Sequence, residues 1–125
     1  MGVSYEILGD LVVLTAKDRV TDDDFRRVIG AIVQDSRFQP GSKMLTYDLD
    51  AAYEPAATDP KESAAVINSF MTHFSRRLAV VVGQEASIGL GRMIEENCKV
   101  FDIEFRAFRD PNEAKEWLFR EPSEI

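Results

Sequence analysis

Asp48 and Asp50 are the side chains whose type and spacing best suit chemistry in this sequence. They lie at the end of KMLTYDL, residues 43–49, which is typical of a strand. In open α/β sheets, ligands bind at the carboxyl ends of strands, where two carboxylates can hold Mg²⁺ or act as acid and base. No third residue with a recognisable ligand spacing accompanies them. We therefore interpret both as loop acids that solvate the edge of the sheet.

His73 and Cys98 are the single histidine and the single cysteine, so a mechanism with an imidazole base must use His73. His73 flanks the apolar stripe of a predicted helix, which indicates a partly exposed side chain. Cys98 shares an apolar helix face with Leu90 and Ile94, which indicates a buried, unreactive thiol. We therefore expect no catalytic residue, no metal and no cofactor. An enzyme built on His73 and the aspartate pair is the weakest interpretation.

The stretch VVVGQEASIGLGRM, residues 80–93, places three glycines after an apolar strand and raises the question of a nucleotide-binding turn. A dinucleotide fingerprint needs its glycines at the turn between strand and helix. Gly89 and Gly91 fall inside the predicted helix instead, and no Gly-Lys-Ser/Thr of a Walker motif follows. We expect Gly91 to permit close packing of this helix on the sheet, and Gly89 to be exposed.

The elements that must position these residues alternate between strands and helices. Strand patterns occur at 3–8, 11–16, 43–49, 78–82 and 101–108, and Gly9–Asp10 joins the first two as a hairpin signal. Helices are predicted to start at Thr21, Asp59 and Asp110, each with an acid three positions later, and another covers 87–98. The order β-β-α-β-α-β-α-β-α predicts a single α/β domain over 1–125 with one mixed, mostly parallel sheet.

The charge of the chain limits the classes of partner. The net charge is -7 and the isoelectric point is about 4.7. An acidic protein of this kind is repelled by nucleic acid and by anionic membrane. The start of the chain does not resemble a signal peptide, and no apolar run approaches the length of a membrane span. We expect a cytoplasmic protein that neither binds nucleic acid nor inserts into a membrane.

The second half of the chain carries a recognisable pattern. RRLAVVVG (76–83), a helix that contains GRMIEE (91–96), and FRAFRDPNEAKEWL (105–118) resemble the small bacterial STAS-like proteins. These have the SpoIIAA-like fold of the anti-sigma-factor antagonists, which is broadly similar to CRAL-TRIO lipid-binding domains. The resemblance implies a STAS-like α/β domain that acts without catalysis, as a binding or regulatory module for a protein partner.

The segment after the third strand departs from that family. The regulatory members carry a phosphorylated serine in an aspartate–serine–glycine segment at a helix start, whereas DLDAAYEPAATDPKES (48–63) lacks this tripeptide and is longer and acidic. Phosphorylation of Ser63 therefore stays open. The predicted partner-binding residues in this segment and at the helix start are Asp48, Asp50, Tyr53, Asp59 and Ser63.

An alternative function is the transport of a small lipophilic molecule. A helix predicted from Asp59 to near Arg76 places several aromatic residues on one face, and the last strand and helix supply others. They fill a core, or they line an apolar cavity between helices and sheet, as in the lipid-binding relatives. The residues of this set are Phe70, Met71, Phe74, Phe101, Phe105 and Trp117. The sequence leaves the identity of the ligand or partner, the pathway and the oligomeric state open, a homodimer included.

Overall fold

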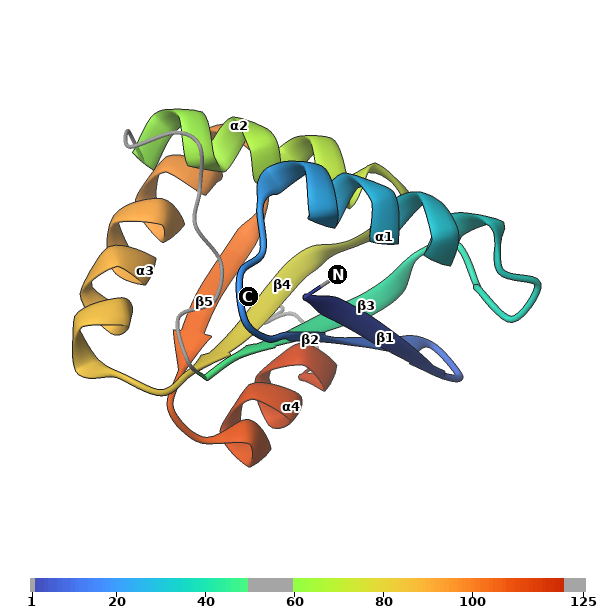
Figure 1. Ribbon diagram of the computed structural model, residues 1–125. Coiled ribbons are helices and arrows are strands. Elements are labelled where there is room, and N and C mark those ends of the chain that lie inside the picture. The colour runs from blue at the N-terminus through green and yellow to red at the C-terminus, as the bar shows by residue number, and fades with distance from the viewer. Residues whose placement is uncertain (1, 50–59, 121–125) are drawn as a thin grey trace.

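The computed structural model describes residues 2–49 and 60–120, which form one five-stranded sheet with helices on both faces (Figure 1). The strands lie in chain order: β1 (Val3–Leu8), β2 (Leu11–Ala16), β3 (Ser42–Asp48), β4 (Phe74–Val82) and β5 (Glu104–Phe108). β1 is antiparallel to β2, and the other neighbours are parallel. The predicted mixed, mostly parallel sheet is confirmed.

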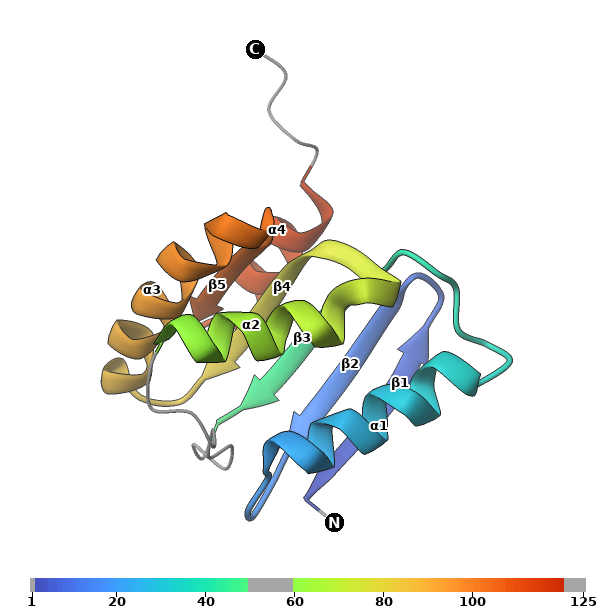
Figure 2. The same cartoon turned by 90° about the horizontal axis from the view of Figure 1, so that it is seen from above.

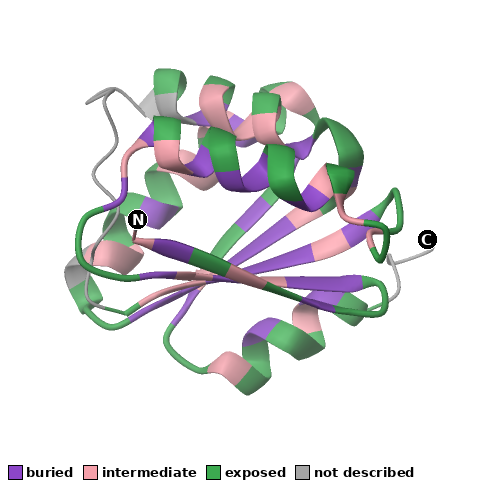
Figure 3. Ribbon diagram, turned by 45° about the vertical axis from the view of Figure 1, so that its right-hand side comes forward, coloured by how far each residue is buried: buried purple, intermediate pink, exposed green. Residues whose placement is uncertain are grey.

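The helices form an unequal pair of layers (Figures 1 and 2). α1 (Asp22–Gln34), α2 (Pro60–Phe70) and α3 (Glu85–Cys98) cover one face, and α4 (Pro111–Phe119) covers part of the other. Two apolar clusters follow from this arrangement. The larger cluster lies under α1, α2 and α3, and the smaller one joins Leu45, Ala79, Val81 and Phe108 to α4 (Figure 3).

The helix starts follow the capping signals of the sequence. Thr21 and Asp24 form a capping box, in which the Asp24 amide donates to Thr21 Oγ1 over 3.3 Å and the Thr21 amide donates to Asp24 Oδ2 over 3.0 Å. The Asn112 amide donates to Asp110 Oδ1 over 2.9 Å at the start of α4. These bonds satisfy amides that the first turn of a helix leaves without intrahelical partners. The cap predicted at Asp59 lies outside the described residues.

The helix predicted to run to near Arg76 ends earlier. α2 ends at Phe70, a 3-10 turn covers Met71–His73, and Phe74 begins β4. The Gly41 amide donates to the His73 carbonyl oxygen over 2.9 Å, and Ser42 pairs with Phe74 in the parallel ladder. Pairing with β3 therefore extends β4 toward the N-terminus and overrides the helical spacing of the apolar residues. β5 likewise starts only at Glu104, because Lys99–Phe101 forms a second 3-10 turn.

The buried face of α3 differs from the prediction by one residue. Gly91 and Cys98 are buried and Ile94 is half-buried, whereas Leu90 is 48% exposed. A Cβ on Gly91 would lie 2.7 Å from the Ala107 Cβ, so the missing side chain sets how closely α3 approaches β5. Because helix and strand meet at Gly91, the neighbouring Leu90 turns toward solvent. The prediction for Gly91 is confirmed and that for Leu90 is wrong.

We expect Gly91→Ala to destabilise the protein by about 1–3 kcal/mol, because the added carbon overpacks the contact with Ala107. Gly89→Ala is the matched control, since a Cβ there meets no atom within 4 Å and alanine is the better helix former by about 1 kcal/mol. Urea unfolding of both variants checks this. Equal effects of the two substitutions would contradict the packing described for α3.

Candidate functional site

The carboxyl edge of the sheet brings several strand ends together. Asp48 is the last residue of β3 and pairs with Val82, the last residue of β4. The Asp48 side chain is partly exposed and takes part in an interaction. Gly83 follows β4 so close to β3 that a Cβ on it would lie 2.1 Å from the Leu49 carbonyl oxygen. The backbones that follow β3 and β4 therefore pack closely against each other, at the place where open α/β sheets bind ligands.

The helix and strand that adjoin this edge carry a further contact. Glu85 begins α3, and its carboxylate pairs over 3.0 Å with the guanidinium of Arg109, which directly follows β5. Both side chains are largely exposed, so the pair contributes little stability. It does link the end of β5 to the start of α3, at the edge where the carboxyl ends of the parallel strands β2, β3, β4 and β5 lie.

The structure describes only part of the predicted partner-binding set. Asp48 lies at the carboxyl edge as expected. Ser63 belongs to the first turn of α2, but its side chain is outside the described part of the structure. Asp50, Tyr53 and Asp59 also lie outside the described residues. The assignment of a partner surface to these residues therefore stays a prediction.

His73 is exposed and lies at the opposite edge of the sheet from Asp48. It ends the 3-10 turn before β4, next to the start of β3, while Asp48 ends β3. With about 3.3 Å per residue, the seven-residue strand separates the two edges by roughly 20 Å. At this separation the two side chains do not meet at one substrate group, and Asp50, the third member of that set, lies outside the described residues.

The predicted lipophilic set is divided by the sheet. Phe70, Met71, Phe74, Phe101 and Phe105 belong to the larger cluster, with Met71, Phe74 and Phe105 buried. The rings of Phe25 and Phe70 lie 6.0 Å apart, and those of Phe38 and Phe74 lie 5.3 Å apart. Trp117 belongs instead to the smaller cluster, 5.6 Å from the ring of Phe108. The six residues therefore do not face one common cavity, because α4 packs on the other face of the sheet.

Cys98 is fully buried in the larger cluster, as predicted. Burial raises the pKa of the Cys98 thiol to about 11, and the charge of Glu95 acts in the same direction. The thiolate is therefore scarce at neutral pH, which fits a side chain that fills space in the core.

The carboxylate of Asp35 is held by hydrogen bonds at the end of α1. Asp35 follows α1, where the Arg37 guanidinium donates to it over 2.8 and 3.1 Å and the Tyr5 hydroxyl donates over 3.0 Å. The Arg37 side chain and amide hold the pKa of Asp35 well below its usual range, while the Asp35 carboxylate raises the pKa of Tyr5. These bonds fasten the end of α1 to β1, so we assign them a structural role.

The arginine doublet of β4 serves both faces of the sheet. Arg76 donates to the carbonyl oxygens of Phe101 and Asp102 and holds the turn before β5. Arg77 donates from Nη1 to the carbonyl oxygens of Trp117 and Arg120 over 2.9 and 2.6 Å, and so caps the end of α4. Neighbouring strand residues point to opposite faces, which explains this division. The doublet is visible in the sequence, but its carbonyl partners are not.

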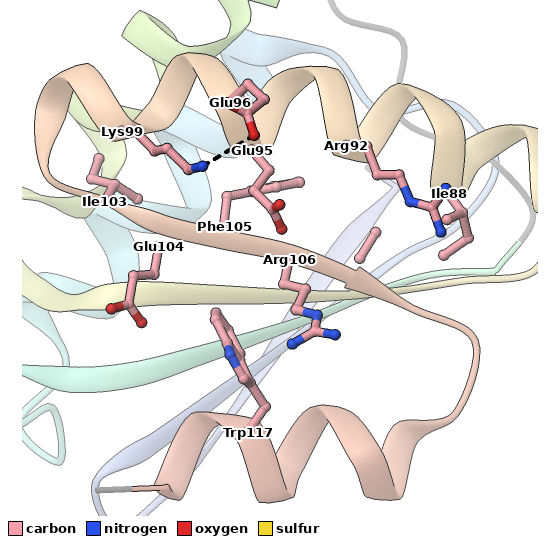
Figure 4. A pocket seen from close by; sticks show the side chains of 11 residues that line it. Ile88, Arg92, Glu95, Glu96, Lys99, Ile103, Glu104, Phe105, Arg106 and Trp117 are labelled. Carbon is pink, nitrogen blue, oxygen red and sulfur yellow. Dashed lines mark hydrogen bonds and ion pairs between the residues drawn. The ribbon is translucent and has the colours of Figure 1, made fainter. Parts of the chain in front are cut away.

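A groove that the sequence did not predict follows β5, which is an edge strand of the sheet (Figure 4). Its volume is about 530 Å³, and it lies between α3 and α4. Arg92 and Glu95 line it from α3, Lys99 from the 3-10 turn that follows α3, Arg106 from β5 and Trp117 from α4. In the sequence, Arg92 and Arg106 are single charges on separate elements, so nothing there indicates that they border one groove.

The described residues contain no group of three or more histidine, cysteine, aspartate or glutamate side chains arranged to hold a metal ion. None of the helices in residues 2–49 and 60–120 combines the length and the apolar character that a membrane span requires.

The fold is SpoIIAA-like. A solved structure of an uncharacterised protein of the DUF3478 family from Shewanella loihica PV-4, described as having a SpoIIAA-like fold, is similar over 93% of this chain and 91% of its own. The TM-score is 0.58 and the sequence identity is 16%, so the likeness concerns the fold. No family model matches the sequence, and no curated protein matches it either. The predicted STAS-like α/β fold is confirmed, while the broader similarity to CRAL-TRIO domains stays a prediction.

Proposed function

We propose that this chain acts without catalysis, as a STAS-like binding or regulatory module for a protein partner. Its contact surface is the carboxyl edge of the sheet together with the segment that leads into α2. The observation that carries the proposal is the close approach of Gly83 to Leu49. It holds the ends of β3 and β4 as a rigid platform from which residues 50–59 depart.

Two further features support a binding role over a catalytic one. The side chains that could supply a base and an acid, His73 and Asp48, lie at opposite edges of the sheet. The thiol of Cys98 is buried and has a raised pKa, which is unfavourable for a nucleophile. The similar SpoIIAA-like structure belongs to an uncharacterised protein, so the similarity is compatible with this role but does not indicate an activity.

We expect Asp50→Lys and Tyr53→Ala each to reduce the capture of the partner by at least about tenfold. The tagged chain is cross-linked in extracts of its source cells, and the captured protein is quantified by mass spectrometry. Glu116→Lys is the matched control for the charge reversal, because Glu116 is exposed on α4, on the other face of the sheet. All variants are expected to retain the parental melting temperature.

The same preparations separate the carrier alternative from the module. Organic extraction of a carrier would release a stoichiometric lipid, and partner capture would then be incidental. A protein that is empty of lipid and whose partner capture survives both substitutions would contradict the proposed contact surface.

A further inference from the structure

The open edge of β5 is a second surface, separate from the carboxyl edge. Among the described residues β5 pairs with β4 alone, so one row of its peptide N–H and C=O groups faces away from the sheet. This edge forms part of the groove of about 530 Å³, with α3 on one side and α4 on the other (Figure 4). A sheet edge in such a groove can accept an added strand, whose side chains contact the two walls.

The two walls of the groove have different chemistry. On one side, Arg92 and Ile88 reach down from α3, and on the other, Trp117 rises from α4 toward Arg106 (Figure 4). Side chains of an extended chain alternate between the two sides of a sheet. Consecutive residues of an added strand would therefore meet the α3 wall and the α4 wall in turn.

Arg92 and Arg106 set the charge that the groove prefers. The other basic and acidic side chains here are largely paired, with Lys99 on Glu96 at 3.0 Å and Arg77 on Glu104 at 2.6 Å. Within residues 2–49 and 60–120, no carboxylate forms an ion pair with Arg92 or Arg106. Arginine binds carboxylates through paired N–H donors, so these guanidinium groups favour an acidic ligand.

The two arginines lie close to each other along β5, near its middle and its carboxyl end. Gly91 packs on Ala107, the fourth of the five residues of β5, so Arg92, the next residue of α3, lies close to that position, and Arg106 is the adjacent, middle residue of the strand. Glu95 comes almost one helical turn later, toward the start of β5, and would repel an acid there. The acidic residues of a ligand are thereby restricted to the stretch from the middle of β5 to its carboxyl end.

We propose that the β5 edge binds an extended segment of a partner protein by strand addition, and that two consecutive acidic residues of that segment engage Arg92 and Arg106. A second copy of this chain fits less well. Paired edges would lie about 4.8 Å apart, whereas packed helices need about 8–10 Å, so the α3 helices over the two β5 strands would collide.

The test uses the full chain and an array of blocked heptapeptides with apolar flanks and an Asp-Asp, Asn-Asn or Lys-Lys centre. Fluorescence anisotropy is expected to show binding of Asp-Asp peptides, with Asn-Asn peptides at least about tenfold weaker. Arg92→Glu and Arg106→Glu should each weaken Kd by at least about tenfold. Lys17→Glu, an equal charge change at an exposed residue beyond β2, should leave Kd unchanged, as should Asp50→Lys.

Peptide N-methylation tests the strand geometry. In an added strand, the N–H groups of alternate residues point toward β5. Methylation of these amides is expected to abolish binding, while methylation of the intervening amides leaves binding intact. Absence of binding by every peptide would overturn the proposal. Arg92 and Arg106 would then be assigned the role of preventing the β5 edge from pairing with strands of other chains. Equal effects of both methylation patterns, or binding of inorganic phosphate with the same dependence on both arginines, would also overturn it. Asp50→Lys is expected to reduce partner capture at the carboxyl edge and to leave peptide binding at the β5 edge unchanged. Failure of the strand-addition proposal is therefore distinguishable from failure of the proposed function.

Discussion

Gly83→Ala is expected to destabilise the protein by about 3 kcal/mol, at the upper end of the range for overpacked sites. The added Cβ would lie 2.1 Å from the carbonyl oxygen and 3.1 Å from the carbonyl carbon of Leu49. Both atoms belong to the backbone, so no side-chain rotation relieves the clash. The ends of β3 and β4 must separate, which breaks the parallel ladder near Asp48 and Val82. Urea unfolding measures the loss.

Gly30→Ala is a control for this substitution, because Gly30 lies within α1 and a Cβ there meets no atom within 4 Å. Alanine at this helix position should stabilise the protein by about 1 kcal/mol. A Gly83→Ala variant as stable as the parent would show that the carboxyl edge tolerates separation of the strands. The rigid platform on which the proposed function depends would then be lost.

Arg77→Ala is expected to cost about 2–3 kcal/mol, because it removes two hydrogen bonds from a charged donor to carbonyl oxygens at the end of α4. The guanidinium also lies 5.4 Å from the centre of the Trp117 ring, so packing is lost with the charge. The ion pair with Glu104 contributes less, since the Glu104 side chain is 58% exposed. Thermal unfolding gives the total, and hydrogen exchange should locate the loss in α4.

The control for Arg77 is Arg109→Ala, which removes an exposed ion pair with Glu85 and should cost no more than about 1 kcal/mol. Glu104→Gln should likewise have an effect within about 0.5 kcal/mol. If Arg77→Ala and Arg109→Ala were equivalent, the carbonyl contacts of Arg77 would not stabilise α4.

Local signals in the sequence were sufficient for the order and type of the elements. Gly9–Asp10 specifies the hairpin, the Thr21–Asp24 box starts α1, and Asp110 starts α4. Each signal works through hydrogen bonds or backbone conformations that involve residues a few positions apart. The run at 78–82 also indicated a strand covered on both faces of the sheet, because every residue in it is apolar and alternate side chains point to opposite faces.

Positions that depend on pairing between distant segments were not predictable in this way. Phe74 has helical spacing with Phe70, yet pairing with Ser42 places it in β4. Leu90 and Gly91 differ by one position, and only the contact with Ala107 decides which of them faces the sheet. A periodic pattern gives the rotation of a helix to within about one residue, or roughly 100° of arc, so this choice is left to packing.

Composition and local patterns were enough to predict an acidic chain, an α/β fold with a mostly parallel sheet and a SpoIIAA-like order of elements, and the position of Asp48 at a strand end. Which residues become neighbours depends on tertiary packing. It put Trp117 on the opposite side of the sheet from the other aromatic residues, separated His73 from Asp48, and opened a groove along β5. The physical reason is that side-chain proximity depends on strand order and on the face that each helix covers, and these are properties of long-range pairing.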